Sequence, residues 1–324
     1  MLLTTLLVLM LTGFVYRRRS GKCTSRRSLR GRTAIVTGAS SGIGKETARD
    51  LARRGARVIL ACRNLMKAQM VADEIMRSTG NKEVVARLVD TADLQSVREF
   101  AREILGTERA IHVLVNNAGI VGPEKRQVTR DGLELTMATN HYGHFLLTNL
   151  LLKRLKQSAP SRVINVASAA HMFTMNIDPR DLNYEKKSYG TMSAYAQSKL
   201  CNILFTFELA QKLRGSGVTT NTLHPGAVST EFFVKDKASR SWLLRALTQA
   251  LNFLVKVVGK DSVLGAQTTI YLSVAEDVED VSGKYFEECK EAACSSLAKD
   301  RTLAKTLWEV SEIDVKLRPA EMYY

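Results

Sequence analysis

The chain has 324 residues and a formal net charge of +15 at pH 7, and its length accommodates one large α/β domain or two smaller ones. The excess charge is concentrated, because eight Lys and Arg residues lie between Arg17 and Arg32 and no Asp or Glu precedes Glu46. Such a local cluster argues against a protein whose whole surface binds nucleic acid.

The first 16 residues carry no charged side chain and are mostly Leu, Val, Met and Thr. As a helix they span about 24 Å, slightly less than a typical hydrocarbon core of about 30 Å, which a thinner bilayer accommodates. A cleaved signal peptide is the alternative, but the basic residues follow the apolar run and no Ala-x-Ala-like site is present. We therefore expect a membrane anchor over residues 1–16 and a basic linker over residues 17–31. Positive charge after the span keeps the remainder of the chain in the cytosol.

The five cysteines form an odd set without zinc-ligand spacing, and the chain has no Asn-x-Ser/Thr sequon. Both features fit reduced thiols in a cytosol-facing domain, with neither disulfides nor a structural metal.

A glycine-rich loop follows the first predicted strand, Thr33–Thr37, and precedes a helical stretch over residues 45–54. In this context the glycines let the backbone approach a pyrophosphate while helix N–H groups point at it. The spacing is Gly-x-x-x-Gly-x-Gly rather than Gly-x-Gly-x-x-Gly, and a glycine turn without a ligand is the alternative. The loop residues predicted to bind a cofactor are Gly38, Ser40, Ser41, Gly42, Ile43 and Gly44.

The second predicted strand, Arg57–Ala61, indicates which nicotinamide cofactor the chain takes. An NAD site usually has Asp or Glu at the end of this strand for the ribose 2′-hydroxyl. This chain has Arg63 there, with Lys45 just inside the first helix, and two cations suit a 2′-phosphate. We therefore predict NADP(H); the alternative is a solvated Arg63.

Four more apolar runs predict strands at residues 84–89, 111–115, 162–167 and 219–223, and they alternate with helical stretches such as residues 65–78 and 94–105. This alternation predicts a single doubly wound, Rossmann-type α/β domain with a mostly parallel sheet. Asp90, at the end of the third strand, either binds the adenine amino group or caps the next helix.

A long helical pattern over residues 132–155 contains Asn140, His141 and His144. The two histidines are spaced as helix neighbours, but no third metal ligand accompanies them, so packing or surface positions are favoured.

Tyr195 and Lys199 lie one turn apart on a helix predicted to run to about Arg214. An ammonium beside a phenol lowers the phenol pKa from its usual value near 10, so the hydroxyl can act as an acid or a base. Two solvated helix residues are the alternative.

Several motifs together resemble the short-chain dehydrogenase/reductase family over roughly residues 31–286. The motifs are Thr37-Gly-x-x-x-Gly-Ile-Gly44, Asn116-Asn-Ala-Gly119, Asn140, Ser168, Tyr195-x-x-x-Lys199 and Pro225-Gly226. Within the family the chain is similar to the microsomal retinol dehydrogenase group (the 11–14 type), through stretches such as Ala61-Cys-Arg63 and Gly143-His-Phe-Leu-Leu-Thr148.

The resemblance implies a role for each motif residue. Tyr195 exchanges the proton of the substrate oxygen, Ser168 binds that oxygen, Lys199 lowers the Tyr195 pKa and holds the nicotinamide ribose, and Asn140 supports a water relay. Further cofactor contacts are implied for Asn117, Ala118, Gly119, Pro225, Gly226 and Thr230.

The resulting domain prediction is a catalytic domain over residues 32–290 and a C-terminal tail over residues 291–324. The basic, apolar stretch at about residues 232–260 is either a substrate lid or a helix packed on the core. The predicted function is NADP(H)-dependent interconversion of retinol and retinal, with reduction favoured, at the endoplasmic reticulum membrane. Reduction of steroid ketones or lipid-derived aldehydes is one alternative, and a non-catalytic NADP(H)-binding scaffold is another. The sequence is compatible with a homo-oligomer but does not specify one.

Overall fold

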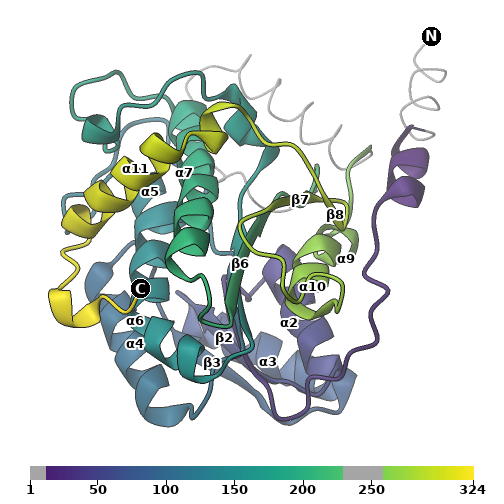
Figure 1. The fold of residues 1–324 in the computed structure, drawn as a ribbon. Helices are drawn as coiled ribbons and strands as arrows, with labels where there is room; N and C mark the ends of the chain where they lie inside the picture. Colours follow the sequence, from purple (N-terminus) through teal and green to yellow (C-terminus); the bar gives the residue numbers. More distant parts are fainter. Residues whose placement is uncertain (1–11, 229–257) are drawn as a thin grey trace.

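A computed structural model describes residues 12–228 and 258–324 (Figure 1). Its centre is an eight-stranded sheet with the order β3-β2-β1-β4-β5-β6-β7-β8, in which β8 alone pairs antiparallel to its neighbour. The strands are β1 (Thr33–Thr37), β2 (Arg57–Cys62), β3 (Val84–Leu88), β4 (Val113–Asn116), β5 (Ser161–Val166), β6 (Val218–Leu223), β7 (Tyr285–Glu287) and β8 (Lys290–Glu291). The strand order reverses between β1 and β4, so the predicted doubly wound α/β fold is confirmed.

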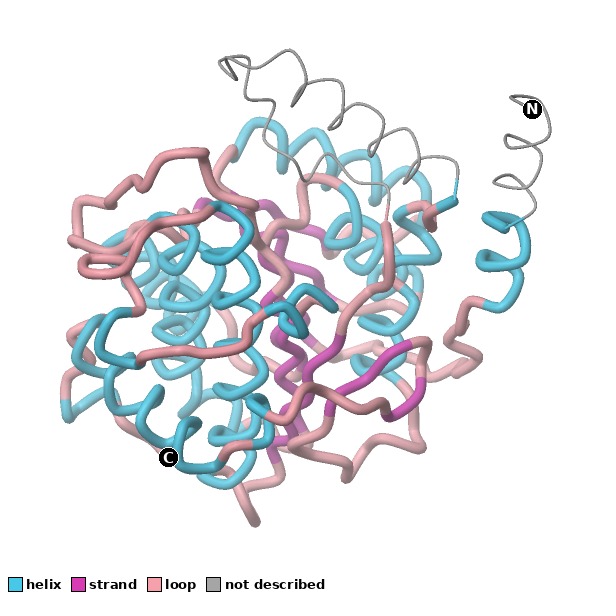
Figure 2. The backbone as a smooth tube through the Cα atoms, turned by 90° about the horizontal axis from the view of Figure 1, so that it is seen from above, coloured by secondary structure: helices cyan, strands magenta, loops and turns pink. Residues whose placement is uncertain are grey.

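Helices cover both faces of the sheet, as the view from above in Figure 2 shows. Alternate side chains of the strands point to opposite faces, so Ile35 enters one core while Ala34 and Val36 enter the other. The first core is closed by α4 (Leu94–Thr107), α6 (Gly143–Gln157), α7 (Thr191–Lys212) and α11 (Arg301–Asp314). The second is closed by α2 (Gly42–Arg53), α3 (Leu65–Thr79) and α10 (Gln267–Val274).

The helix predicted over residues 132–155 differs from the observed one. A short α5 (Leu135–Met137) leads into a π-helical turn, Ala138–Tyr142, and α6 follows directly. A π-helical turn inside a helix is uncommon and often marks a functional position. This one carries Asn140.

Residues 291–324, predicted as a tail, include α11, which lies along α7 in Figure 1. Trp308 of α11 is 2% exposed, and its ring lies 4.9 Å from that of Phe145 and 5.7 Å from that of Phe205. These C-terminal residues therefore complete the first core.

Two predicted segments lie wholly or mainly outside the described residues. Residues 12–19 are helical, but the predicted anchor extends back to residue 1, and within the described ranges no helix is long and apolar enough to cross a membrane. Thr230 and most of the stretch at residues 232–260 also fall outside the described ranges.

Candidate active site

A cleft of about 1260 Å³ lies at the carboxyl ends of the parallel strands. Each of the strands β1 to β6 is followed within two residues by a residue that lines this cleft, because parallel strands end at one edge of the sheet. It is lined by all the predicted cofactor residues that the structure describes: Gly38, Ser40, Ser41, Gly42, Ile43, Gly44, Lys45, Arg63, Asp90, Asn117, Ala118, Gly119, Tyr195, Lys199, Pro225 and Gly226.

The glycine loop lies tightly against the segment after β4. A Cβ atom on Gly38 would lie 2.8 Å from the Ala118 Cα, and one on Gly44 would lie 2.5 Å from the Asn117 side-chain nitrogen. Gly38 also has φ = +66°, a conformation that favours glycine. Helix α2 begins at Gly42, so its free N–H groups face the cleft.

Thr37 holds these two segments together, although it is not among the predicted site residues. Its hydroxyl oxygen accepts hydrogen bonds from the backbone N–H groups of Asn117 (2.9 Å) and Ala118 (3.0 Å). Its position directly before the glycine loop is the sequence signal that could have identified it.

The two histidines of the π-helical region are buried and bonded to hydroxyl groups. His144 Nδ1 lies 3.1 Å from the carbonyl oxygen of Asn140 and therefore donates, which leaves Nε2 to accept from the Thr37 hydroxyl at 2.9 Å. Burial lowers the His144 pKa to about 4, so the ring is neutral at pH 7. His141 Nε2 lies 3.0 Å from the Ser311 hydroxyl of α11.

The end of the cleft near β2 is rich in charge. Arg63 is exposed there, and Lys67 and Arg77 of α3 line the same region without having been predicted. Lys45 donates to Glu74 of α3 at 2.7 Å, so a carboxylate that the sequence did not indicate holds its ammonium group.

Asp90 lines the cleft and accepts a hydrogen bond from the backbone N–H of Ala92 at 3.0 Å. The N-cap of α4 is Asp93, whose carboxylate accepts from the N–H groups of Gln95 and Ser96. Of the two roles considered for Asp90, the helix cap therefore belongs to Asp93.

The predicted catalytic side chains meet at the other end of the cleft. Ser168 follows β5, and its hydroxyl is hydrogen-bonded to that of Tyr195 on α7. One turn further along α7, Lys199 Nζ donates to the carbonyl oxygen of Val166 at 2.9 Å. A Cβ atom on Gly119 would lie 3.3 Å from Lys199 Nζ, so this glycine leaves room for the ammonium group.

Asn140 lies beside this group, but outside the lining of the cleft. Its side-chain nitrogen donates to the Ile120 carbonyl and the Ser198 hydroxyl, each at 2.9 Å. Its oxygen accepts from the Ile120 N–H at 2.8 Å and would lie 3.2 Å from a Cβ atom on Gly119. The π-helical turn thus brings Asn140 next to Lys199.

The lowered Tyr195 pKa that was expected is not found in the chain alone, because burial has the largest effect on it. Burial raises the pKa of Tyr195 to about 12, against a lowering effect of the hydrogen bond with Ser168. Burial also lowers the pKa of Lys199 to about 8, and its Nζ lies 5.8 Å from the centroid of the Tyr195 ring. At pH 7 the phenol is therefore protonated and equipped to donate a proton, beside a lysine that is mostly cationic.

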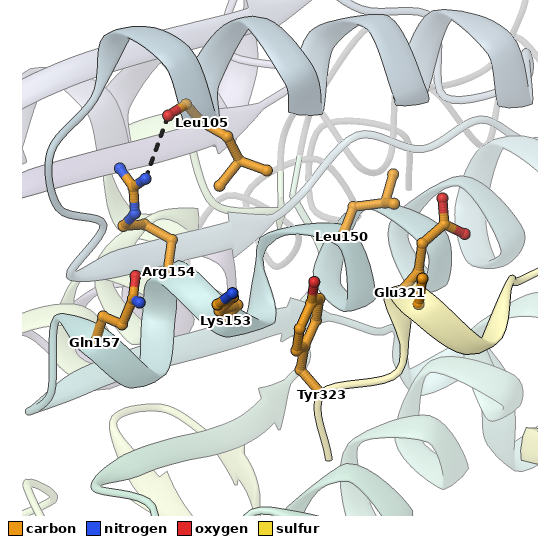
Figure 3. Close-up of a pocket in the computed structure, with 8 residues that line it drawn as sticks. Leu105, Leu150, Lys153, Arg154, Gln157, Glu321 and Tyr323 are labelled. Atoms are coloured by element: carbon orange, nitrogen blue, oxygen red, sulfur yellow. Dashed lines mark hydrogen bonds between the residues drawn. The ribbon is translucent and has the colours of Figure 1, made fainter.

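A second hollow of about 350 Å³ lies at the carboxyl ends of α4 and α6, beside the C-terminal residues (Figure 3). Leu105, Leu150, Lys153 and Tyr323 are among its lining residues, and none of the predicted site residues contributes to it.

A dinucleotide-type cleft that ends at a serine, a tyrosine and a lysine defines an oxidoreductase of Rossmann fold. The family model for short chain dehydrogenases matches residues 32–179. Retinol dehydrogenase 11 of Homo sapiens is 46% identical over 292 residues, which are 90% of this chain and 88% of that protein. The chain belongs to the short-chain dehydrogenase/reductase family, as an oxidoreductase that acts on CH–OH donors, and within it to the microsomal retinol dehydrogenase group.

Two solved structures extend the comparison. An uncharacterized protein from Mycobacterium paratuberculosis superimposes with a TM-score of 0.72 at 34% identity, covering 92% of this chain and 98% of its own. A protein assigned as an NAD(P)-dependent gluconate 5-dehydrogenase from Beutenbergia cavernae, solved with NADP bound, has a TM-score of 0.60 at 28% identity and covers 81% of this chain and 96% of its own.

Proposed function

We propose that the protein is an NADP(H)-dependent oxidoreductase that interconverts a retinoid, or a similar lipophilic alcohol, with its aldehyde, and that reduction of the aldehyde is favoured. The observation that carries the proposal is the buried, protonated Tyr195 hydrogen-bonded to Ser168 at the end of a dinucleotide-sized cleft. The similarity to retinol dehydrogenase 11 supports the substrate class.

The residues of the cleft fit a dinucleotide. Gly38 and Gly44 pack so closely on their protein neighbours that neither has space for a Cβ atom, and both line the cleft where the backbone of such a loop contacts a pyrophosphate. When bound, NADPH supplies the hydride that reaches the carbonyl carbon of the substrate. The protein supplies the remaining parts of the reaction.

In the reducing direction, Ser168 orients the substrate by a hydrogen bond to the carbonyl oxygen, and Tyr195 donates its hydroxyl proton to that oxygen. The nearby Lys199 ammonium stabilises the phenolate that remains until it is reprotonated. Asn140 holds Ile120 and Ser198 around this group through three hydrogen bonds. In the oxidising direction the same oxygen accepts the proton.

The preference for NADP(H) rests on Arg63, with Lys67 and Arg77 beside the same part of the cleft. We expect Arg63→Asp to raise the Kd for NADPH about 10- to 100-fold and to bring the Kd for NADH below it, because charge-assisted hydrogen bonds to a phosphate are worth about 1.5–3 kcal/mol. Titration of cofactor fluorescence measures both values. Arg109→Asp is the matched control, since Arg109 is also exposed but does not line the cleft. Equal use of NADH and NADPH by the unmodified protein would contradict the assignment.

The substrate class is tested by NADPH consumption with all-trans-retinal, medium-chain aldehydes and steroid ketones. We expect retinal to give the highest kcat/KM and the activity to sediment with membranes of cells that express the full chain, because residues 1–16 are proposed to anchor it in the endoplasmic reticulum with the catalytic domain in the cytosol. A preference for steroid ketones would favour the alternative reductase. NADPH binding without turnover of any carbonyl would favour a scaffold, and activity in the detergent-free soluble fraction would refute the anchor.

A further inference from the structure

The polypeptide that leads into the catalytic domain contacts the wall of the cleft. The Tyr16 hydroxyl accepts a hydrogen bond from the backbone N–H of Ala227 at 3.2 Å, and Arg17 donates to the carbonyl oxygen of Gly259 at 3.0 Å. A little further on, the backbone N–H of Gly21 donates to a carboxylate oxygen of Glu288 at 2.7 Å. We call residues 16–22 the N-terminal strap.

A buried lysine joins this strap to the rest of the domain. Lys260 is 2% exposed, and its Nζ lies 2.5 Å from the other carboxylate oxygen of Glu288 and 5.6 Å from the centroid of the Tyr16 ring. Its backbone N–H donates to the carbonyl oxygen of Ala227 at 2.8 Å, next to a parallel bridge between Lys260 and Val228. Burial of the Lys260 ammonium group has a large desolvation penalty, which only good geometry and further hydrogen bonds around the ion pair offset. The strap supplies one of those bonds through Gly21.

The turn that presents Glu288 is strained. Glu288 and Cys289 form the two-residue turn between β7 and β8, with φ = +51° and +59°, where Asn and Gly are the usual residues. Gly21 approaches this turn so closely that a Cβ atom on it would lie 2.0 Å from the Glu288 carbonyl oxygen. A strained turn, an ion pair with a buried lysine and a glycine contact therefore coincide at one place outside the catalytic group.

These groups support the segment after β6, Pro225–Val228. Pro225, Gly226 and Val228 line the cleft. A Cβ atom on Gly226 would lie 2.7 Å from the Tyr16 hydroxyl and 3.1 Å from Lys260 Nζ, so both groups lie directly behind the segment. Strand β6 neighbours β5, which leads to Ser168, so this part of the wall belongs to the catalytic end of the cleft.

We infer that Tyr16, Lys260 and Glu288 are positioning residues that hold Pro225–Val228 as the wall beside the nicotinamide half of the bound cofactor. They act through the backbone of this segment. The inference rests on the dinucleotide-binding part of the proposed function. It makes the N-terminal strap a structural part of the cofactor site, in addition to its place after the predicted anchor.

The test compares two ligands on the full chain in detergent: NADPH, and 2′,5′-ADP, which lacks the nicotinamide half. We expect Lys260→Met to raise the Kd for NADPH about tenfold and Tyr16→Phe about threefold, because a misplaced wall weakens the contacts with that half. The Kd for 2′,5′-ADP is expected to stay unchanged. If the unmodified chain binds NADH more tightly, NADH and 5′-ADP replace the two ligands.

Lys284→Met is the matched control. Lys284, directly before β7, forms an ion pair with Glu291 of β8 at 2.8 Å, but both side chains are about half exposed and neither lines the cleft. Its Kd for NADPH should equal that of the unmodified protein. Glu288→Gln, which keeps an oxygen for the Gly21 N–H, serves if Lys260→Met does not fold, and a rise in the NADPH Kd alone is again expected.

The inference would be overturned if both Tyr16→Phe and Lys260→Met bound NADPH as tightly as the unmodified protein. Glu288→Gln takes the place of Lys260→Met in this comparison if that variant does not fold. An equal loss of affinity for NADPH and 2′,5′-ADP would also overturn it, because that pattern indicates a general loss of structure. The proposed function has a different failing result: the unmodified protein would bind NADPH but turn over no carbonyl substrate. In that case the comparison of Kd values still tests the inference.

Discussion

The Tyr195→Phe variant is expected to bind NADPH as the unmodified protein does and to lose about 10²- to 10⁴-fold in kcat for carbonyl reduction. The substitution removes only the hydroxyl group, and the ring is 8% exposed, so the packing around it is kept. Because burial holds the Tyr195 pKa at about 12, this hydroxyl carries a proton at pH 7. The variant therefore lacks the group that donates a proton to the substrate oxygen. NADPH consumption at saturating aldehyde, together with cofactor titration, measures both quantities.

Tyr271→Phe is the control for this experiment. Tyr271 lies on α10, and its hydroxyl donates to Asp277 at 2.8 Å. It does not line the cleft, so its removal should leave the rate unchanged. If Tyr195→Phe reduced the aldehyde as fast as the unmodified protein, another group would have to protonate the product. If it lost NADPH binding together with activity, the effect would be structural and the proposed role of Tyr195 would remain without support.

Trp308→Ala is expected to lower the free energy of unfolding by about 3–5 kcal/mol, the usual range for an aromatic side chain removed from a core. The ring packs against Phe145, Phe205 and Tyr324, with centroids 4.9, 5.7 and 4.9 Å away. Its loss leaves a cavity between α11 and the two helices α6 and α7, and therefore beside the helix that carries Tyr195 and Lys199. Denaturant unfolding of the ligand-free protein in detergent measures the change.

Ile313→Ala tests whether the effect comes from burial rather than from any change in α11. Ile313 lies on the same helix, but is 74% exposed, and its replacement is expected to change the unfolding free energy by less than about 0.5 kcal/mol. Equal stability of Trp308→Ala and Ile313→Ala would show that residues 301–314 behave as a tail. A large difference would show that they are part of the domain core.

Much of the catalytic cleft was predictable because its residues lie in short motifs at the ends of buried strands. The apolar runs around Ile35 and Ile59 identify strands, and parallel strands deliver the residues that follow them to one edge of the sheet. Gly38, Ser168 and Pro225 are each found by this reasoning, whatever their distance along the chain. The spacing of Tyr195 and Lys199 on one helix likewise depends only on helix geometry.

Several features that the sequence did not reveal are contacts between segments distant in the sequence. Strand β8 has only two residues, which is too short for a sequence pattern to predict its pairing. Helix α11 lies too far from the motifs in the sequence for its packing to be inferred. The ion pair of Glu74 with Lys45 and the hydrogen bond between His144 and Thr37 also could not be inferred from the sequence.

The sequence by itself determined the class of fold, the position of the glycine loop and the residue proposed to transfer the proton, because these depend on local periodicity and on residue type. Only the tertiary structure decided the state of that group. Burial raises the pKa of Tyr195 and lowers that of Lys199, and burial is a property of the packed chain. The tertiary structure also decided what supports the cleft, since Gly21 and Glu288 meet across 267 positions of sequence.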